Sequence, residues 1–452
     1  MLSSLSTSRR RDGRNVRMTM IGCGHLGATH AASMAEIGHD VLGVDIDEAK
    51  IATLRSGRAW FHEPELDEML ARHVASGRLR FTTDFADAGE FGDVHFIGVA
   101  TPGVPGRGDY DLSQLYAAVE ALAPHLHREC LIVGKSTVSV GTTAAVQELV
   151  RDLAPAGDRV GVAWNPEFLR EGHAVADTLR PDRIVAGVSS MEAERLIREA
   201  YKPITDIGVP LVVTDPATCE LVKGAANAFL AMKISFINAI ADVCEAAGGD
   251  VAHLADAIGL DPRIGRAMLD AGLGYGGGCL PKDTRAFAAR AGELGVDQAV
   301  ELLGVVDRIN AARRDHAVAL TLKVCGGALT GRRVTVWGAS FKVGTDDIRD
   351  SPALDVASRL HQQGAHVTVH DPMAIPTARA AHPELTYAED LVQAAEGADV
   401  LLVMTAWPQF RAVHPQEVAE VVASRVVIDA RSALNDGWWD EAGWTVHRIG
   451  RG

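Results

Sequence analysis

The sequence lacks a surplus of positive charge and a long uninterrupted apolar run, and aromatic residues are few, at 5% of 452. The formal net charge of −15 argues against nucleic-acid or anionic-membrane binding, because both need clustered Lys and Arg. No stretch reaches the roughly 18 consecutive apolar residues of a membrane span. Residues 1–17 lack the apolar core of a secretory signal and predict a disordered extension. We therefore expect no nucleic-acid partner and no membrane partner.

Paired cysteines are also lacking, since no two cysteines stand in a CxxC or a zinc-ligand spacing. Free thiols in that arrangement are typical of a reducing compartment rather than a disulfide framework. The sequence thus predicts a cytoplasmic protein without a metal site. The chain is longer than one hydrophobic core usually supports, so two or three domains are expected. The six cysteines are Cys23, Cys130, Cys219, Cys244, Cys279 and Cys325.

The first pattern present is that of a dinucleotide-binding site. A predicted strand over 18–21 runs into the motif GCGHLG at 22–27 and then into a helical pattern through Ile37. Such glycines allow a tight turn and close approach of a pyrophosphate to the helix N-terminus. A second strand over 40–44 ends in Asp45, whose carboxylate suits ribose hydroxyls and repels a 2′-phosphate. NAD is therefore favoured over NADP, with a glycine turn that binds no ligand as the alternative.

Four further short apolar runs alternate with helical patterns, which predicts a parallel, doubly wound sheet. Polar residues follow two of these runs, Thr101-Pro102 after one and Lys135-Ser136-Thr137 after the next. Ligands of such sheets bind at the carboxyl ends of the strands. We favour a binding role for Thr137, although a helix N-cap would place the same residue type there. The four predicted strands cover 79–83, 94–99, 131–134 and 160–163.

A polar loop, NPEFLREG at 165–172, follows the last of these strands. Loops held by a rigid scaffold are suited to carry a general base, and this one has Glu167 and Glu171. Either glutamate taken alone would equally be a solvated side chain.

A long helix is predicted over 216–247, after a strand over 211–214. It is apolar on more than one side, which indicates burial between domains or in a subunit interface. Lys223 and Asn227 stand four residues apart and share one face. Burying them is costly unless they are paired or face a polar site, and the alternative is a lysine that extends to solvent.

Gly274–Asp283 reads GYGGGCLPKD, a composition that neither a helix nor a strand interior tolerates. A thiol on such a loop is accessible, and a neighbouring cation such as Lys282 favours the thiolate that attacks carbon. Cys279 is therefore a candidate nucleophile, with a buried structural cysteine as the alternative.

A second α/β module follows helices predicted over 250–258, 284–294 and 299–324. Its first strand, 333–337, ends in a turn with Lys342 but without the GxGxxG pattern. Arg349 and Arg431 are further cations near strand ends, so the module suits a second anionic nucleotide. Surface arginines are the alternative. The other predicted strands cover 366–370, 399–404 and 426–429.

Together these patterns predict an α/β protein with two Rossmann-like doubly wound parallel-sheet domains joined by a helical middle domain with a long central helix. The expected boundaries are 1–17 for the extension, 18–214 for the NAD-binding domain, 215–325 for the middle domain and 326–452 for the C-terminal domain.

The ordered motifs resemble the UDP-glucose/GDP-mannose dehydrogenase family over nearly the whole chain after Met18. They include GCGHLG, KST at 135, NPEFLREG, GYGGGCLPKD, ASFKVGTDDIRDSPALD at 339 and DAR at 429. At a few positions the chain has a residue that differs from the one common in the family. These positions are Glu65, Ser139, Gly278, Leu280, Ala430 and Ser432.

The resemblance implies oxidation of the C6 alcohol of a nucleotide sugar to a carboxylate, UDP-glucose to UDP-glucuronate, with two NAD per sugar. It implies a homodimer or higher homo-oligomer built on the middle domain. In the implied mechanism Cys279 holds the aldehyde as a thiohemiacetal and then a thioester. Lys223 and Asn227 stabilise the oxyanion, Asp283 and Thr137 order a water, and Glu167 is the base for hydrolysis.

The resemblance also implies binding residues. Those for the cofactor are Gly22, Gly24, Leu26, Gly27, Asp45, Thr101, Pro102, Thr137, Glu171 and Lys282. Those for the substrate are Phe168, Leu169, Arg170, Lys223, Asn227, Tyr275, Gly276, Phe341, Lys342 and Arg431, with Arg263 reaching the sugar of a neighbouring subunit.

Several alternatives stay open. GDP-mannose 6-dehydrogenases share the 165–172 and Cys279 motifs, and enzymes that oxidise N-acetylated UDP-sugars rank behind them. A single-hydride hydroxyacid or phosphogluconate-type dehydrogenase would have no use for the Cys279 loop or the second module. A non-catalytic nucleotide-sugar sensor could lose Cys279 or Lys223, and both are present.

Overall fold

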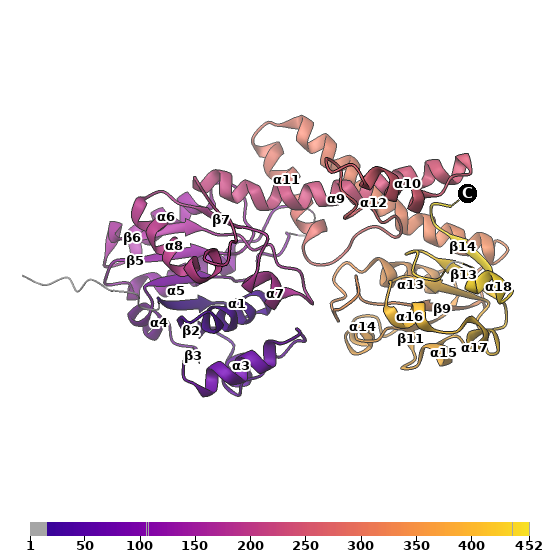
Figure 1. Cartoon of the computed structure of the whole chain (residues 1–452), viewed down its shortest axis with the longest axis horizontal. Helices are drawn as coiled ribbons and strands as arrows, with labels where there is room; N and C mark the ends of the chain where they lie inside the picture. The colour runs from indigo at the N-terminus through magenta and orange to yellow at the C-terminus, as the bar shows by residue number, and fades with distance from the viewer. Residues whose placement is uncertain (1–15, 105, 107, 436, 452) are drawn as a thin grey trace, which may run out of the picture. The chain divides into compact units, whose positions relative to one another are not determined.

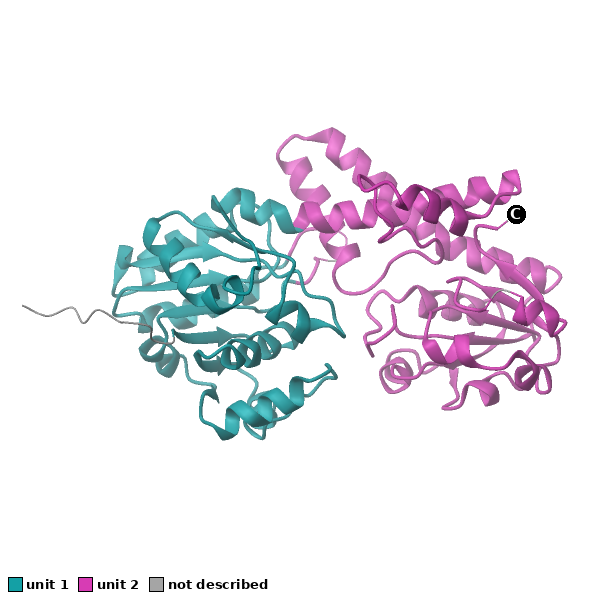
Figure 2. Cartoon of the chain, in the orientation of Figure 1, with its two compact units in different colours: residues 1–101, 111–223 teal, residues 102–110, 224–452 magenta. Residues whose placement is uncertain are grey.

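The computed structural model describes residues 16–104, 106, 108–435 and 437–451. The chain divides into two compact units: residues 1–101 with 111–223, and residues 102–110 with 224–452 (Figure 2). The helical middle region therefore forms one unit with the C-terminal module from Gly224 onward, and its first residues, 215–223, belong to unit 1. Residues 1–15 of the extension expected over 1–17 lie outside the described residues. Val16 is already buried and the first strand begins at Arg17, one residue before the expected boundary.

Unit 1 contains an eight-stranded sheet in the order β3-β2-β1-β4-β5-β6-β7-β8. The first six strands run parallel, as the alternating pattern predicted. The strands are β1 (Arg17–Ile21), β2 (Asp40–Val44), β3 (Leu79–Thr82), β4 (Val94–Ile97), β5 (Cys130–Gly134), β6 (Val160–Trp164), β7 (Ile184–Gly187) and β8 (Leu211–Thr214). The helices are α1 (His25–Glu36), α2 (Glu48–Arg55), α3 (Leu66–Ala75), α4 (Phe85–Phe91), α5 (Ser113–Leu122), α6 (Thr142–Leu153), α7 (Ala174–Leu179) and α8 (Met191–Thr205), with 3-10 turns at Ala123–His125 and Gly157–Arg159.

Helices cover both faces of this sheet (Figure 1). Successive strand residues point to opposite faces, so Met20 packs in a core with α1, α3 and α8. The next residue, Ile21, packs in a second core with α5 and α6. Both faces are buried, which is why the strands read as continuous apolar runs.

The far edge of the unit 1 sheet differs from the expectation of an all-parallel sheet. β7 was not predicted, and it pairs antiparallel with β6 through Trp164 and Gly187. β8 then pairs parallel with β7. A Cβ at Gly187 would lie 2.5 Å from Cys219 Cβ, so a glycine is needed where this strand passes α9.

The long helix α9 spans Pro216–Ala247, the bounds expected from the sequence. By length and composition it could cross a membrane, with a mean hydropathy of 1.3 over an 18-residue window that is 44% buried. It is not an uninterrupted apolar run, since Glu220 and Lys223 interrupt it and both are buried. Glu220 accepts hydrogen bonds from Gly141 N and Thr143 N in unit 1, as expected of a helix packed in a protein core.

Unit 2 combines the middle helices with a six-stranded parallel sheet in the order β11-β10-β9-β12-β13-β14. Counted from its own first strand, this is the order of the first six strands of unit 1. The strands are β9 (Arg333–Trp337), β10 (His366–His370), β11 (Thr386–Tyr387), β12 (Val400–Val403), β13 (Val426–Asp429) and β14 (Thr445–Arg448). The helices are α10 (Val251–Gly259), α11 (Leu280–Glu293), α12 (Asp297–Val324), α13 (Pro352–Gln362), α14 (Ile375–Ala381), α15 (Leu391–Ala394), α16 (Pro408–Ala412), α17 (Pro415–Ala419) and α18 (Trp438–Glu441).

The two modules share one turn geometry after their first strand. Gly22 and Gly338 both have a positive φ, and the next residue in each turn donates its N–H to a carboxylate at the end of the second strand. Cys23 N lies 2.8 Å from Asp45 Oδ2, and Ala339 N lies 2.8 Å from Asp371 Oδ2. Asp371 Oδ2 also accepts from Ser340 N and Trp407 Nε1. Its Oδ1 accepts from Met373 N and Ala374 N, so both oxygens have hydrogen-bond partners within unit 2.

Candidate active site

The glycine turn after β1 has the shape that a pyrophosphate requires. A Cβ at Gly27 would lie 1.8 Å from Gly22 O, and one at Gly22 would lie 2.9 Å from Val99 Cγ1. Both glycines are therefore fixed by close packing. A Cβ at Gly24 would meet no heavy atom within 4 Å, and Gly24 is the N-cap of α1. The turn thus leaves open space at a helix N-terminus, where an anion is favoured.

Asp45 follows β2 at the edge of this turn and is partly exposed. Its Oδ2 accepts from Cys23 N and its Oδ1 accepts from Asp47 N, at 2.8 and 3.0 Å. A carboxylate has about four acceptor positions, so Asp45 keeps capacity for ribose hydroxyls. The residues of unit 1 therefore fit a dinucleotide without a 2′-phosphate.

The polar residues that follow β4 and β5 contact each other. Thr101 Oγ1 donates to Thr137 O at 2.8 Å, and both residues are buried. Next to Thr137, the ammonium of Lys135 donates to Asn165 Oδ1 at 2.9 Å. Burial lowers the pKa of Lys135 to about 8. The predicted cofactor residue Pro102 belongs to unit 2 by the division of the chain.

In the polar loop after β6, Glu167 forms an ion pair with Lys223. Glu167 Oε1 lies 3.2 Å from Lys223 Nζ, and Glu167 Oε2 accepts from Leu169 N at 2.8 Å. The aromatic ring of Phe168 lies 5.4 Å from the same ammonium. Lys223 is 5% exposed, so the alternative of a lysine that extends to solvent is wrong.

Arg170 lies apart from this group. Its guanidinium pairs with Asp177 through two nitrogens, at 2.9 and 2.7 Å, and its side chain is 67% exposed. That pairing raises the pKa of Arg170 further. The partner of Arg170 is therefore a residue of α7. Glu171, the next residue, is half-buried.

In unit 2, the buried carboxylate of Asp283 accepts hydrogen bonds from three side chains. Asn227 Nδ2 donates to Oδ2 at 2.6 Å, while Lys282 Nζ and Tyr110 OH donate to Oδ1 at 2.7 and 3.0 Å. Asp283 is 1% exposed. Burial, followed by the charge of Asp283, raises the pKa of Tyr110 far above its usual value. Tyr110 was missed from the sequence because its loop has no periodic pattern.

Cys279 is the N-cap residue of α11 and is exposed, whereas the other five cysteines are buried. The backbone carbonyl of Cys279 accepts a hydrogen bond from Asp283 N at 2.8 Å. This bond connects the backbone of Cys279 to that of Asp283. Burial raises the pKa of Cys130 to about 11 and that of Cys219 to about 12. Cys279 is thus the accessible thiol, and the alternative of a buried structural cysteine is wrong.

The glycines before Cys279 are required by close contacts with the second module. A Cβ at Gly276 would lie 2.2 Å from Asp350 O, and one at Gly277 would lie 2.7 Å from a ring carbon of Phe341. Gly277 N also donates to Arg349 O at 2.8 Å. The predicted substrate residue Phe341 therefore packs against Gly277, the neighbour of the predicted substrate residue Gly276.

Other predicted substrate residues lie on the same loop or beside it. Tyr275 is buried, and its N–H donates to Asn310 Oδ1 at 2.8 Å. Arg431 Nη1 donates to Gly274 O at 2.9 Å, and burial lowers the pKa of Arg431 to about 10. Lys342 lies with its ammonium 5.8 Å from the ring of Phe341.

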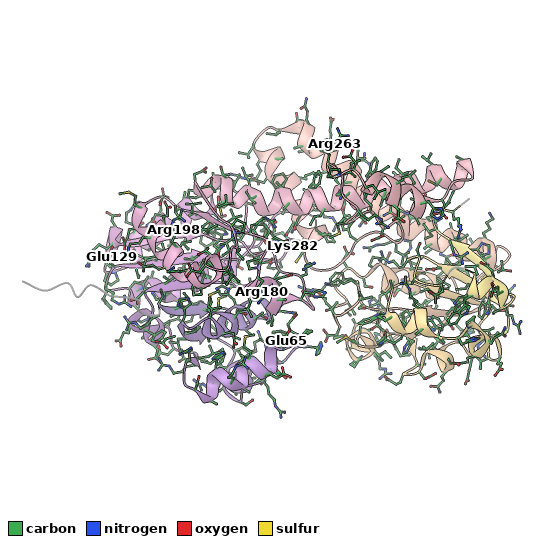
Figure 3. The ribbon with its side chains drawn as sticks, viewed as in Figure 1. Glu65, Glu129, Arg180, Arg198, Arg263 and Lys282 are labelled. Atoms are coloured by element: carbon green, nitrogen blue, oxygen red, sulfur yellow. The ribbon has the colours of Figure 1, made fainter. Side chains whose placement is uncertain are left out.

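Arg263, labelled in Figure 3, lies on a turn after α10. Its side chain is 87% exposed and pairs with Asp261 at 2.6 Å. The expected contact of Arg263 with a neighbouring subunit stays a prediction.

One group of the described residues has the composition of a metal site, although none was expected. Ligand atoms of Asp242, Glu245 and His316 lie within 4.8 Å of one another. Arg313 pairs with Asp242 at 2.5 Å, and a guanidinium beside the carboxylate opposes a bound cation.

Comparisons with known proteins identify the family. Residues 16–205 match the NAD binding domain of the UDP-glucose/GDP-mannose dehydrogenase family, 217–312 its central domain and 335–436 its UDP binding domain. A UDP-glucose 6-dehydrogenase of Rhizobium meliloti (strain 1021) is 42% identical over 96% of this chain and 100% of its own length.

Solved structures agree. A UDP-glucose dehydrogenase from Pyrobaculum islandicum superposes with a TM-score of 0.91 at 38% identity, covering 98% of this chain and 99% of that one. A UDP-D-ManNAc dehydrogenase from Pyrococcus horikoshii gives 0.85 at 27% identity, covering 96% of this chain and 99% of that one.

Proposed function

The chain belongs to the UDP-glucose/GDP-mannose dehydrogenase family, and we propose that it oxidises the C6 alcohol of UDP-glucose to the carboxylate with two NAD and one water. The observation that carries this proposal is Cys279, an exposed thiol on a glycine loop backed by the buried Asp283. A single-hydride alcohol dehydrogenase needs no such nucleophile. An oxidation that passes through an aldehyde needs one, because a covalent bond retains the intermediate.

NAD, when bound, supplies the hydride acceptor for both oxidations. Gly22, Gly24 and Gly27 would hold its pyrophosphate, and Asp45 its ribose. In the first oxidation the proton of the C6 hydroxyl passes to a water, which Asp283 and Thr137 would order. The hydroxyl carbon becomes an aldehyde carbon.

The Cys279 thiolate then attacks the aldehyde carbon, and a carbon–sulfur bond forms as the carbonyl π pair moves to oxygen. Lys223 and Asn227 would stabilise this oxyanion, a contribution that reaches about 3 kcal/mol per donor. Loss of the second hydride leaves a thioester on Cys279.

Hydrolysis of the thioester regenerates the thiol. Glu167 would take a proton from the attacking water, which adds to the thioester carbon and expels the Cys279 thiolate. The Lys223 ammonium at 3.2 Å keeps the Glu167 carboxylate in place. General-base catalysis of this kind is worth roughly 10²–10⁴ in rate.

The second module supports a nucleotide sugar as substrate. Phe341, Lys342 and Arg431 cluster beside the loop that carries Cys279, and the Asp371 oxygens that would serve a dinucleotide ribose are occupied. Loop residues Phe168, Leu169 and Tyr275, with Gly276, would contact the sugar. Glu171, Lys282, Leu26, Thr101 and Pro102 would complete the cofactor site.

The substrate assignment is tested by a cofactor-coupled assay over UDP-glucose, GDP-mannose, UDP-N-acetylmannosamine and a 2-hydroxyacid. We expect the highest kcat/KM with UDP-glucose. A higher value with GDP-mannose or with the N-acetylated sugar would replace the proposed substrate, and activity confined to the hydroxyacid would replace the reaction.

We further propose a cytoplasmic homodimer in which the middle domain, residues 215–325, forms the interface. Phe229, Phe236 and Val243 stand seven residues apart on α9 and are 56%, 50% and 59% exposed. An apolar stripe with this spacing suits a helix–helix contact. Sedimentation should show a dimer that Phe236→Glu weakens, and an unchanged assembly would place the interface elsewhere.

A further inference from the structure

Glu63 is a buried carboxylate of unit 1 that the proposed mechanism does not use. It is 5% exposed and lies in the segment between α2 and α3. Its Oε2 lies 2.9 Å from His25 Nε2 and accepts from Gly172 N at 2.9 Å. Its Oε1 accepts from Ala174 N at 2.7 Å. One side chain thus joins two segments that are far apart in the sequence.

The two segments are the ones that the proposed reaction depends on. His25 is the first residue of α1, directly after Gly24 in the turn that fits a pyrophosphate. Gly172 ends the polar loop that carries Glu167, and Ala174 is the first residue of α7, which follows the loop. The His25 ring also stacks on Phe61, two residues before Glu63, at a centroid distance of 4.3 Å.

The backbone is strained two residues after Glu63, at Glu65. Glu65 is the N-cap residue of α3 and has a φ of 66°, in the left-handed region that residues other than glycine rarely adopt. Such strain persists where the surroundings over-determine the conformation and often marks a functional site.

The carboxylate is held in its charged form. Burial opposes ionisation of Glu63, but the hydrogen bonds from His25, Gly172 and Ala174 outweigh it and lower the pKa of the carboxyl. Removing the Glu63 carboxylate would leave three hydrogen-bond donors without an acceptor, which is unfavourable inside a protein.

We propose that Glu63 is a positioning residue that couples the cofactor turn, through His25, to the polar loop 165–172. Binding of a dinucleotide at the N-terminus of α1 restrains His25, His25 restrains Glu63, and Glu63 restrains the backbone at Gly172 and Ala174. This inference rests on the proposed cofactor and loop roles, but it does not depend on which sugar is oxidised.

Hydrogen exchange of the Gly172 and Ala174 amides, with and without NAD, tests the coupling. In the natural chain we expect NAD to slow both amides by about tenfold or more, since opening then requires release of a bound ligand. Glu63→Gln should lose most of the protection in both states. His25→Phe keeps the stack on Phe61 and should retain protection without NAD but lose the increment that NAD adds.

Glu36→Gln is the matched control, because Glu36 also pairs with a histidine, His73, at 2.5 Å at the other end of α1. Glu36→Gln should leave the hydrogen exchange of the Gly172 and Ala174 amides, and the effect of NAD on it, unchanged. If Glu63→Gln folds poorly, His25→Phe decides alone. A full NAD increment in His25→Phe, or equal effects of Glu36→Gln and Glu63→Gln, would overturn the proposal, whatever the sugar assay shows.

Discussion

The ammonium of Lys223 lies 3.2 Å from the carboxylate of Glu167. Lys223 comes from α9 and Glu167 from the loop after β6, and the two are 6% and 14% exposed at their side chains. A buried pair of opposite charges holds both groups in place, because removing either one leaves the other uncompensated. In the proposed reaction the same two groups serve different steps, Lys223 at the oxyanion and Glu167 at the hydrolytic water.

Glu167→Gln should separate these steps. The amide keeps the shape of the side chain but cannot take a proton, so kcat should fall by roughly 10²–10⁴ while the first turnover still releases NADH. The thioester on Cys279 should then appear as added mass on the intact protein. Glu192→Gln, at an exposed ion pair on α8, is the control. Turnover within about twofold of the natural chain would remove Glu167 from the base role.

Cofactor choice depends on Asp45. We expect NAD to be preferred over NADP by roughly 100-fold or more, since juxtaposed like charges cost several kcal/mol. Asp45→Asn should narrow the ratio of the two kcat/KM values while keeping an acceptor for Cys23 N. Equal use of both cofactors by the natural chain would show that this carboxylate does not face the ribose.

The second module should bind the nucleotide of the sugar through Lys342. Lys342→Ala should raise the KM for the nucleotide sugar strongly and leave NAD affinity nearly unchanged. Lys202→Ala, which removes an exposed lysine of α8, should change neither. Calorimetric titrations with UDP and with NAD measure the two affinities separately. A loss confined to NAD would reverse the assignment of the modules.

Acid should destabilise unit 1 through His95. Burial, followed by the charge of Arg128, lowers the pKa of His95 to about 3. The unfolded chain therefore binds more protons between pH 6.5 and 3, and the stability present above pH 6.5 is lost as the pH falls through this range. At pH 5 the loss from this one group is about 2 kcal/mol.

His95→Gln keeps a partner for Thr19 Oγ1, which lies 2.8 Å from His95 Nδ1, but it does not titrate. Denaturant unfolding at pH 7 and pH 5 should show a smaller drop in the variant than in the natural chain. An equal drop in the two proteins would mean that His95 is protonated without cost.

The sequence predicted the elements with long or strongly periodic patterns. α9 and the strands β9, β10 and β13 have the expected bounds, because a 32-residue helix and runs of β-branched residues give strong signals. β7 is four residues long and reverses direction at the sheet edge. No local pattern encodes the direction of a strand, so this edge was not predictable.

The proposed catalytic side chains could be predicted as residue types but not as contacts. Asp283 was expected to order water, yet its bonds to Asn227 and Tyr110 depend on how α9, α11 and the loop before α5 pack. Glu63 was overlooked because a single glutamate between two helices resembles any solvated side chain. Its role follows from burial, which is a property of the tertiary structure.

The covalent role of Cys279 is the central claim, and the yield of NADH per sugar tests it most directly. Each UDP-glucose consumed should give about two NADH and one acid, with no free aldehyde trapped by an added hydrazine, because the thiohemiacetal forms before release. Cys279→Ser should accumulate an ester slowly, since an alkoxide leaves poorly, and Cys279→Ala should be inactive in the second oxidation. One NADH per sugar in the natural chain, together with normal activity of Cys279→Ala, would contradict the account and make the thiol structural.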